Sequence, residues 1–148
     1  MKLEKLLLTT DLSEEGERPY AAVAELARAT GASITLLHVV EDVAVAPHGA
    51  PLAPPIHAPD IKRIVHEAET VLEDHAKRLG NGIPIDARVL TGPQVAQAIA
   101  EFASEGGYDL LAVSTHGRSG FRRMVMGSVA ETLLRHTRTP VLVFPRHE

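Results

Sequence analysis

The chain alternates between short, almost continuous apolar runs and longer segments in which apolar residues recur at helical spacing. Short apolar runs bounded by turn residues are typical of buried strands, whereas a spacing of three and four residues is typical of amphipathic helices. The apolar runs predict strands at residues 5–9, 33–40, 85–90, 110–113 and 139–144. The helical spacing is clearest in a long stripe formed by Ile61, Ile64, Val65, Ala68, Val71, Leu72 and Leu79.

Strand and helix alternate along the whole chain, which favours one α/β domain over residues 1–148. The predicted fold is a doubly wound, five-stranded parallel sheet with helices on both faces, joined by right-handed crossovers. Strand 85–90 alternates apolar and polar residues, so it is expected at an edge of the sheet. Strand 110–113 is the most apolar and is expected in the interior of the sheet.

Several residues are typical of helix boundaries. Ser13 is predicted to cap the first helix, Pro93 to take the first position of the third, and Ser128 to form a capping box with Glu131. Glycines are predicted to end the first three helices, at Gly31, Gly80 and Gly106-Gly107.

Residues 41–59 form a connection of a different kind. They contain five prolines and show little periodicity. A connection of 19 residues without regular structure is long for a compact domain. This segment is therefore predicted to be a lid or flap.

The composition narrows the class of protein. A chain of 148 residues is long enough to form one hydrophobic core without stabilising cross-links. The lack of cysteine excludes disulfides, thiolate catalysis and cysteine-based zinc sites. Fifteen basic and 19 acidic side chains give a net charge of −4, which offers no general attraction to nucleic acid or anionic lipid. No apolar run approaches the ~20 residues that cross a bilayer. We expect a cytoplasmic protein that binds neither nucleic acid nor membrane.

Polar and small residues gather where two of the predicted strands end. In such sheets, ligands bind beyond the carboxyl ends of the strands, where the winding reverses. Thr10, Asp11 and Ser13 follow the first strand, and a glycine-containing loop that begins with Ser114 follows the fourth. Gly127-Ser128 then starts a helix, whose free N–H groups and positive dipole end suit a phosphate.

Each of these signals also has a simpler interpretation. Arg118, Arg122 and Arg123 add positive charge to the loop, but they are equally compatible with a solvated loop face. Ser128 is compatible with an ordinary helix cap, and Asp11 with an Asx turn. From the pattern alone, both interpretations stay open.

The chain contains eight histidines, but their spacing does not favour a metal site. His66 and His75 lie nine residues apart on one predicted helix, too far for paired ligands. No metal ligands are expected in the protein itself.

The residues around these strand ends resemble the universal stress protein family, and the resemblance extends over the whole chain. It is carried by residues 10–13 (Thr-Asp-Leu-Ser), by His38-Val39, and by the segment 113–145 with its closing Thr-Pro-Val-Leu-Val at 139–143. Nucleotide-binding members have the pattern Gly, two residues, Gly, nine residues, Gly, then Ser or Thr. This chain has Ser114, two residues, Gly117, nine residues, Gly127 and Ser128, so serine replaces the first glycine.

The resemblance implies a Rossmann-like fold of the adenine nucleotide alpha hydrolase type, ATP as ligand, and Mg²⁺ bound through the phosphates. It implies that Asp11 contacts the ribose, that the backbone of Val39 holds the adenine, and that Gly127 and its neighbours carry the phosphates. The full set that it implies for the nucleotide is Thr10, Asp11, Val39, Val113, Ser114, Gly117, Arg118, Gly127, Ser128 and Val129. It also implies a homodimer formed through the last strand, at Val141, Leu142 and Val143.

Three other functions are weighed against a nucleotide-binding regulatory protein. An enzyme is disfavoured beyond slow ATP hydrolysis, because the loop lacks a Walker-type Gly-Lys-Ser/Thr and no second carboxylate accompanies Asp11. A phospho-receiver domain needs an acidic pair after the first strand and an aspartate ending the third, and neither is present. A homodimeric interaction protein that binds no nucleotide stays open because of Ser114.

Overall fold

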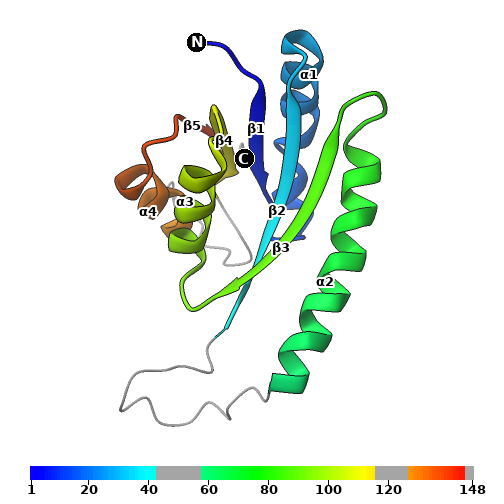
Figure 1. Ribbon diagram of the computed structural model, residues 1–148, viewed down its shortest axis with the longest axis vertical. Helices are drawn as coiled ribbons and strands as arrows, with labels where there is room; N and C mark the ends of the chain where they lie inside the picture. Colours follow the sequence, from blue (N-terminus) through cyan, green and yellow to red (C-terminus); the bar gives the residue numbers. More distant parts are fainter. Residues whose placement is uncertain (43–57, 116–126, 146–148) are drawn as a thin grey trace.

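The computed structural model describes residues 1–42, 58–115 and 127–145. Strands and helices alternate along the chain (Figure 1). The elements are β1 (Lys5–Thr9), the 3₁₀ turn η1 (Glu15–Glu17), α1 (Tyr20–Thr30), β2 (Ser33–Glu41), α2 (Ala58–Leu79), β3 (Ile85–Gly92), α3 (Val95–Gly106), β4 (Leu110–Ser114), α4 (Ser128–His136) and β5 (Val141–Phe144). The predicted lid falls mainly on residues 43–57, outside the described residues.

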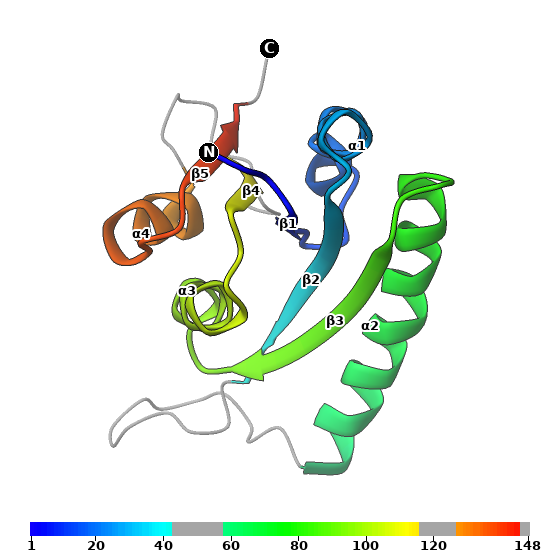
Figure 2. The ribbon, with the colours of Figure 1, turned by 45° about the horizontal axis from the view of Figure 1, so that its top comes forward.

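The strands form one parallel sheet in the order β3-β2-β1-β4-β5. Helices α1 and α2 cover one face of the sheet, and α3 and α4 cover the other (Figures 1 and 2). This arrangement confirms the predicted doubly wound α/β fold, with β3 at an edge and β4 inside. The winding reverses between β1 and β4, so a ligand site is expected where these two strands end.

The sheet separates two hydrophobic cores. Because successive side chains of a strand point to opposite faces, β1 contributes to both cores. Leu6 and Leu8 pack with Val23 and Leu72 beneath α1 and α2. On the other face, Leu7 packs beneath α3 and α4. These leucines of β1 are almost completely buried, which fixes β1 at the centre of the molecule.

The start of α1 differs from the prediction. The helix begins at Tyr20, with Pro19 as its N-cap, and Ser13 lies well before it. Proline is tolerated at a helix start but not in its interior, so the helix cannot extend back through residue 19. Ser13 instead stabilises η1, since its Oγ accepts a hydrogen bond from the N–H of Gly16 at 3.1 Å.

The predicted starts of two further helices were wrong by one or two positions. Gly127 is the N-cap of α4, and Ser128 is the first helical residue, so the serine makes no capping hydrogen bond. Glu131 pairs with Arg135 at 2.9 Å rather than with the helix start. Similarly, α3 begins at Val95, two residues beyond Pro93, and the extended Gln94 is its N-cap.

Within the described ranges, no helix combines the length and apolar character that crossing a bilayer requires.

Candidate functional site

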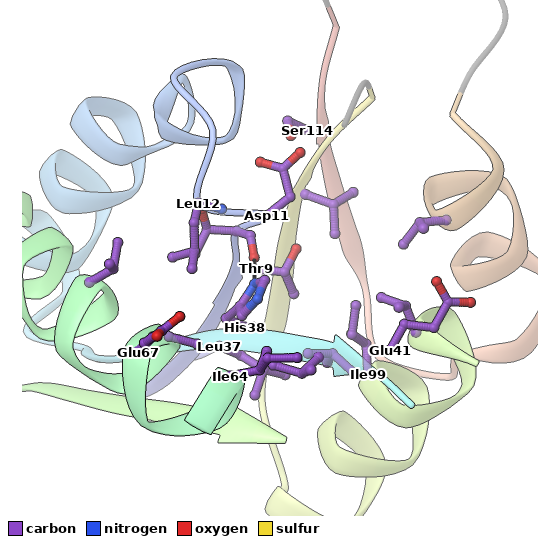
Figure 3. Close-up of a pocket in the computed structure, with 18 residues that line it drawn as sticks. Thr9, Asp11, Leu12, Leu37, His38, Glu41, Ile64, Glu67, Ile99 and Ser114 are labelled. Carbon is purple, nitrogen blue, oxygen red and sulfur yellow. Dashed lines mark hydrogen bonds between the residues drawn. The ribbon is translucent and has the colours of Figure 1, made fainter. Parts of the chain in front are cut away.

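A cleft of about 580 Å³ opens at the carboxyl ends of β1, β2 and β4 (Figure 3). Its walls come from these strand ends, from the middle of α2, and from the starts of α3 and α4. The residues that line it are Thr9, Thr10, Asp11, Leu12, Leu37, His38, Val39, Val40, Glu41, Ile64, Glu67, Ala68, Val71, Val95, Ile99, Val113, Ser114 and Val129. The cleft therefore lies at the point where the winding of the sheet reverses.

The polar end of the cleft is a tight turn that follows β1. Asp11 Oδ1 accepts hydrogen bonds from the Ser13 N–H, at 3.0 Å, and from the Ser13 hydroxyl. This is the Asx-type geometry that the sequence left as an alternative. The second oxygen, Asp11 Oδ2, is the one buried side-chain polar atom without a hydrogen-bond partner in the described residues. An Asx turn thus accounts for one carboxylate oxygen only.

Thr10 holds the same turn from the other side. Its N–H donates to the carbonyl of Leu37 at 2.9 Å, and its Oγ1 accepts from the Leu12 N–H at 3.1 Å. The Thr10 carbonyl lies 2.9 Å from Nδ1 of His38, so this histidine nitrogen carries the proton and donates. Leu12 has a φ of 66°, which a leucine adopts only where its surroundings enforce it.

The opposite end of the cleft is mainly apolar, with the carboxylates of Glu41 and Glu67 at its walls. Val39 lies at the end of β2, Ile64 and Val71 come from α2, and Val95 and Ile99 come from α3. Val71 belongs to the apolar stripe of α2 and yet is 41% exposed. Its exposure follows from the cleft, because this part of α2 faces the opening rather than the core. The cleft can therefore hold a ligand with a flat apolar part and a polar part.

Ser114 ends β4 beside the turn, and its backbone carries no left-handed strain. Leu12 is the one non-glycine residue with a positive φ in the described part of the chain. A serine can therefore take this position without the strain that would favour glycine. Figure 3 shows Ser114 and Asp11 at the same end of the cleft.

The N-terminus of α4 is held against the end of β4 and contributes Val129 to the cleft. Gly127 donates its N–H to the carbonyl of Thr115 at 2.7 Å, and Thr115 in turn donates to Phe144 at 3.1 Å. The first N–H groups of a helix have no acceptor within the helix, and here these belong to Ser128, Val129 and Ala130. This end of the cleft is thus suited to an anion.

The nucleotide-binding residues implied by the sequence fall into three groups. Six of them line the cleft: Thr10, Asp11, Val39, Val113, Ser114 and Val129. Gly127 and Ser128 lie at the start of α4, next to the cleft but not among its lining residues. Gly117 and Arg118, together with Arg122 and Arg123, lie outside the described residues.

Sequence reasoning did not identify the wall formed by the two helices. Ile64 and Val71 were recognised only as members of the apolar stripe of α2, in which a cleft-lining residue and a core residue look alike. The carboxylates of Glu41 and Glu67 were also missed (Figure 3). Glu67 is paired with Arg63 on the preceding turn of α2, at 3.1 Å, which reduces its effect on the charge of the cleft. In the ranges that the structure describes, no three potential ligands come together to hold a metal ion.

The fold and the cleft together define a doubly wound α/β protein with a cleft at the reversal of the sheet. The sequence places it more closely: residues 2–145 match the model of the universal stress protein family. The chain belongs to this family.

Two curated relatives illustrate the range of similarity. Universal stress protein MJ0577 of Methanocaldococcus jannaschii is 24% identical over 97% of this chain and 95% of its own length. Universal stress protein MJ0531 of the same organism is 39% identical, but the match covers 42% of this chain and only 36% of that protein.

Solved structures agree with the fold over the full chain. The structure of MJ0577 has a TM-score of 0.83 at 22% identity and covers 100% of this chain and 99% of that one. A universal stress protein in complex with cAMP has a TM-score of 0.65 at 26% identity, with 99% of this chain and 100% of that one covered.

Proposed function

We propose that this protein is an ATP-binding regulator of the stress response, which holds an adenine nucleotide at the carboxyl ends of β1 and β4. The observation that carries the proposal is Asp11 Oδ2, a buried acceptor without a partner at the polar end of the cleft. Leaving such an oxygen unsatisfied costs about 1–3 kcal/mol, and a ligand that donates a hydrogen bond removes this cost.

The ribose is the part of the nucleotide that suits Asp11. A carboxylate accepts hydrogen bonds but cannot donate them, and the two ribose hydroxyls are donors. Ser13 holds Oδ1 in place at 3.0 Å, so the direction of Oδ2 is fixed before a ligand arrives. Such preorganisation lowers the entropy that binding has to overcome.

The adenine fits the apolar end of the cleft. The main chain of Val39, near the end of β2, can form hydrogen bonds with the edge of the base. Aliphatic side chains of α2 and α3 can pack against its faces. The similar protein solved with cAMP supports an adenine nucleotide as the ligand class.

The phosphates are proposed to lie at the start of α4. Ser128 and Val129 present main-chain N–H groups there, and Thr10, Val113 and Ser114 line the approach. Gly117 and Arg118 are proposed to complete the phosphate site together with Gly127, and Mg²⁺ is proposed to bind through the phosphates rather than through protein ligands. The proposed role is binding, with at most slow hydrolysis.

We further propose that the protein is cytoplasmic, that residues 1–148 form a single domain, and that two copies of the chain form a homodimer. β5 is an edge strand, and its Leu142 is 37% exposed. An uncovered apolar edge favours pairing with another strand, so Val141, Leu142 and Val143 are proposed as the dimer contact.

Calorimetric titration with ATP and Mg²⁺ tests the proposal, after removal of any nucleotide that co-purifies. We expect Asp11→Asn to weaken binding by about tenfold or more, because the amide keeps an acceptor for Ser13 but turns the partnerless oxygen into a donor. Asp86→Asn is the matched control, since Asp86 is an exposed carboxylate near the other end of the sheet. Absence of binding to the nucleotide-free protein would contradict the proposal and favour the interaction protein that binds no nucleotide.

A further inference from the structure

Gly16, in the middle of η1, lies directly against the carboxylate of Asp11. The glycine is buried. A Cβ added to it would lie 2.5 Å from Asp11 Oδ1 and 3.0 Å from Thr10 Oγ1. Heavy atoms in favourable van der Waals contact are about 3.5–4.0 Å apart. Any side chain at this position therefore forces a neighbouring atom to move.

The backbone of Gly16 does not itself require a glycine. The glycines with a positive φ among the described residues are Gly31, Gly80, Gly82 and Gly107, and Gly16 is not one of them. A residue with a side chain can adopt such a backbone conformation without strain. The property that matters at this position is thus the missing side chain.

Ser13 joins Gly16 to Asp11 through hydrogen bonds on both sides. The Ser13 N–H donates to Asp11 Oδ1 at 3.0 Å, and Ser13 Oγ accepts from the Gly16 N–H at 3.1 Å. The Gly16 N–H also lies 3.1 Å from the Ser13 carbonyl oxygen. These contacts fix Oδ1, while Oδ2 stays buried without a partner in the part of the chain that the structure describes.

The turn η1 is anchored on its outer side, so it does not readily move away from Asp11. Glu17 accepts a hydrogen bond from Arg78 of α2 at 2.9 Å, and Arg18 donates to the carbonyl of Pro145, just after β5, at 3.2 Å. The turn also contacts β4. The carboxylate of Asp11, in contrast, can rotate about its own side-chain bonds. A methyl group added at this position would therefore displace the carboxylate rather than η1.

We propose that Gly16 is a positioning residue for the ligand cleft: the Asp11 carboxylate occupies the space where a side chain of residue 16 would lie, and this contact fixes the direction of Oδ2. The effect on ligand affinity rests on the proposed function, whereas the effect on the turn does not depend on a ligand. Gly16 is not among the residues that line the cleft, so its contribution to binding acts through Asp11.

The test compares Gly16→Ala with Gly31→Ala. Each variant gains one methyl group, but a Cβ at Gly31 meets no atom within 4 Å, and the φ of 73° there makes the substitution costly for stability alone. Calorimetry gives the affinity for ATP with Mg²⁺, and urea midpoints give the stability. The proton chemical shift of the Ser13 amide, measured by NMR before ATP is added, reports its hydrogen bond to Asp11.

We expect Gly16→Ala to weaken ATP binding by about 5- to 10-fold and to move the Ser13 amide proton upfield, because the displaced carboxylate gives up its hydrogen bond. Gly31→Ala is expected to lower the urea midpoint and to leave the affinity and the Ser13 amide unchanged. A folded Gly16→Ala protein with wild-type affinity and a wild-type Ser13 amide overturns the inference.

A double variant separates the contact with Asp11 from a general packing effect. Asp11→Ala removes the oxygen that the new Cβ would approach, so adding Gly16→Ala is expected to change the affinity by less than about twofold. A further loss as large as that of Gly16→Ala alone contradicts the inference. If Gly16→Ala does not fold by itself, folding of the double variant supports the inference, and failure of the double variant to fold overturns it.

The two proposals fail in different ways. If the wild type binds no nucleotide, the proposed function fails, while the Ser13 amide shift of Gly16→Ala still decides whether Gly16 sets the position of the carboxylate. If the wild type binds ATP and Gly16→Ala binds it equally well with an unchanged Ser13 amide, only the role of Gly16 fails.

Discussion

At the scale of single residues, the cleft depends on a turn in which each side chain has a separate task. Thr10 Oγ1 accepts a hydrogen bond from the Leu12 N–H, and the Ser13 N–H donates to one oxygen of Asp11. Leu12 itself adopts a left-handed backbone conformation with a φ of 66°. A left-handed leucine costs about 1–2 kcal/mol, which the surrounding hydrogen bonds and the packing of Leu12 against the core offset. The turn is thus fixed before a ligand binds.

His75 makes folding stability depend on pH. Burial lowers its pKa, so the folded protein keeps the neutral form where the unfolded chain has begun to take up a proton. The contribution of His75 is complete above its ordinary pKa of about 6.5 and is lost as the pH falls through the lower folded value.

We expect urea midpoints of the wild type to fall between about pH 7 and pH 5, and those of His75→Gln to fall less. His66→Gln is the control, since His66 lies exposed on the same helix. Parallel curves for the wild type and His75→Gln would show that another group is responsible.

Residue roles were only partly predictable from the sequence. Asp11 was singled out because it follows a strand that ends where the winding of the sheet reverses, a place where ligands bind. Val39 was named only through the resemblance to the universal stress protein family. The hydrogen bond between Tyr20 and His75 was not predicted, because 55 residues separate them and only the packing of α1 on α2 brings them together. A polar residue within an apolar stripe is the one signal that the sequence offers for such a pair.

At the scale of elements, strands were easier to predict than helix starts. A buried strand needs only a short apolar run, and each predicted run lies within a strand or overlaps one. Helix starts depend on local competition instead: Pro19 stops α1 from extending backward, and Gly127 takes the capping position next to Ser128. In the sequence, both Gly127 and Ser128 are suitable N-cap residues, and only the backbone geometry shows which of them takes this position.

The predicted ends of α1 and α3 are confirmed, and they allow a quantitative test. Gly31 and Gly107 have φ values of 73° and 63° and donate their N–H groups to Ala27 and Ala103. An added Cβ at Gly31 meets no atom within 4 Å, so its cost is conformational alone. We expect Gly31→Ala to lower the free energy of unfolding by about 1 kcal/mol in urea denaturation.

Gly92→Ala is the matched control for Gly31→Ala. The φ of Gly92 is not positive, and an added Cβ would make an ordinary contact with Ala98 at 3.5 Å. Its expected effect is much smaller. Equal destabilisation by the two substitutions would contradict the role assigned to the left-handed cap.

At the scale of the whole molecule, the edge of the sheet should control assembly. In sedimentation experiments, we expect the wild type to be a dimer and Leu142→Lys to be a monomer, because a charge on β5 disfavours pairing at this edge. Leu134→Lys on α4 is the control: Leu134 is 46% exposed, but it does not belong to the edge strand. A monomeric wild type, or dissociation by the Leu134 substitution alone, would contradict the proposed contact.

The strand pattern and the reversal rule were enough to predict the position of the cleft in the fold. The shape of the cleft was not predictable, because its apolar wall depends on how far α2 extends past the ends of the strands (Figure 1). An apolar stripe indicates which face of a helix is covered but not whether protein or ligand covers it. Only the position of α2 in the structure shows that Val71 lines the cleft.

The most direct test of the central claim is an NMR titration of the ¹⁵N-labelled, nucleotide-free protein with ATP and Mg²⁺. Our account predicts saturable shifts of the amides of Asp11, Val39, Ser114 and Val129, which line one cleft from the turn after β1 and from β2, β4 and α4. The amides of Gly31 and Asp86, at remote loops and strand starts, should stay unchanged. Absence of shifts, or shifts confined to the outer surface of α3 and α4, would contradict a nucleotide site at the reversal of the sheet.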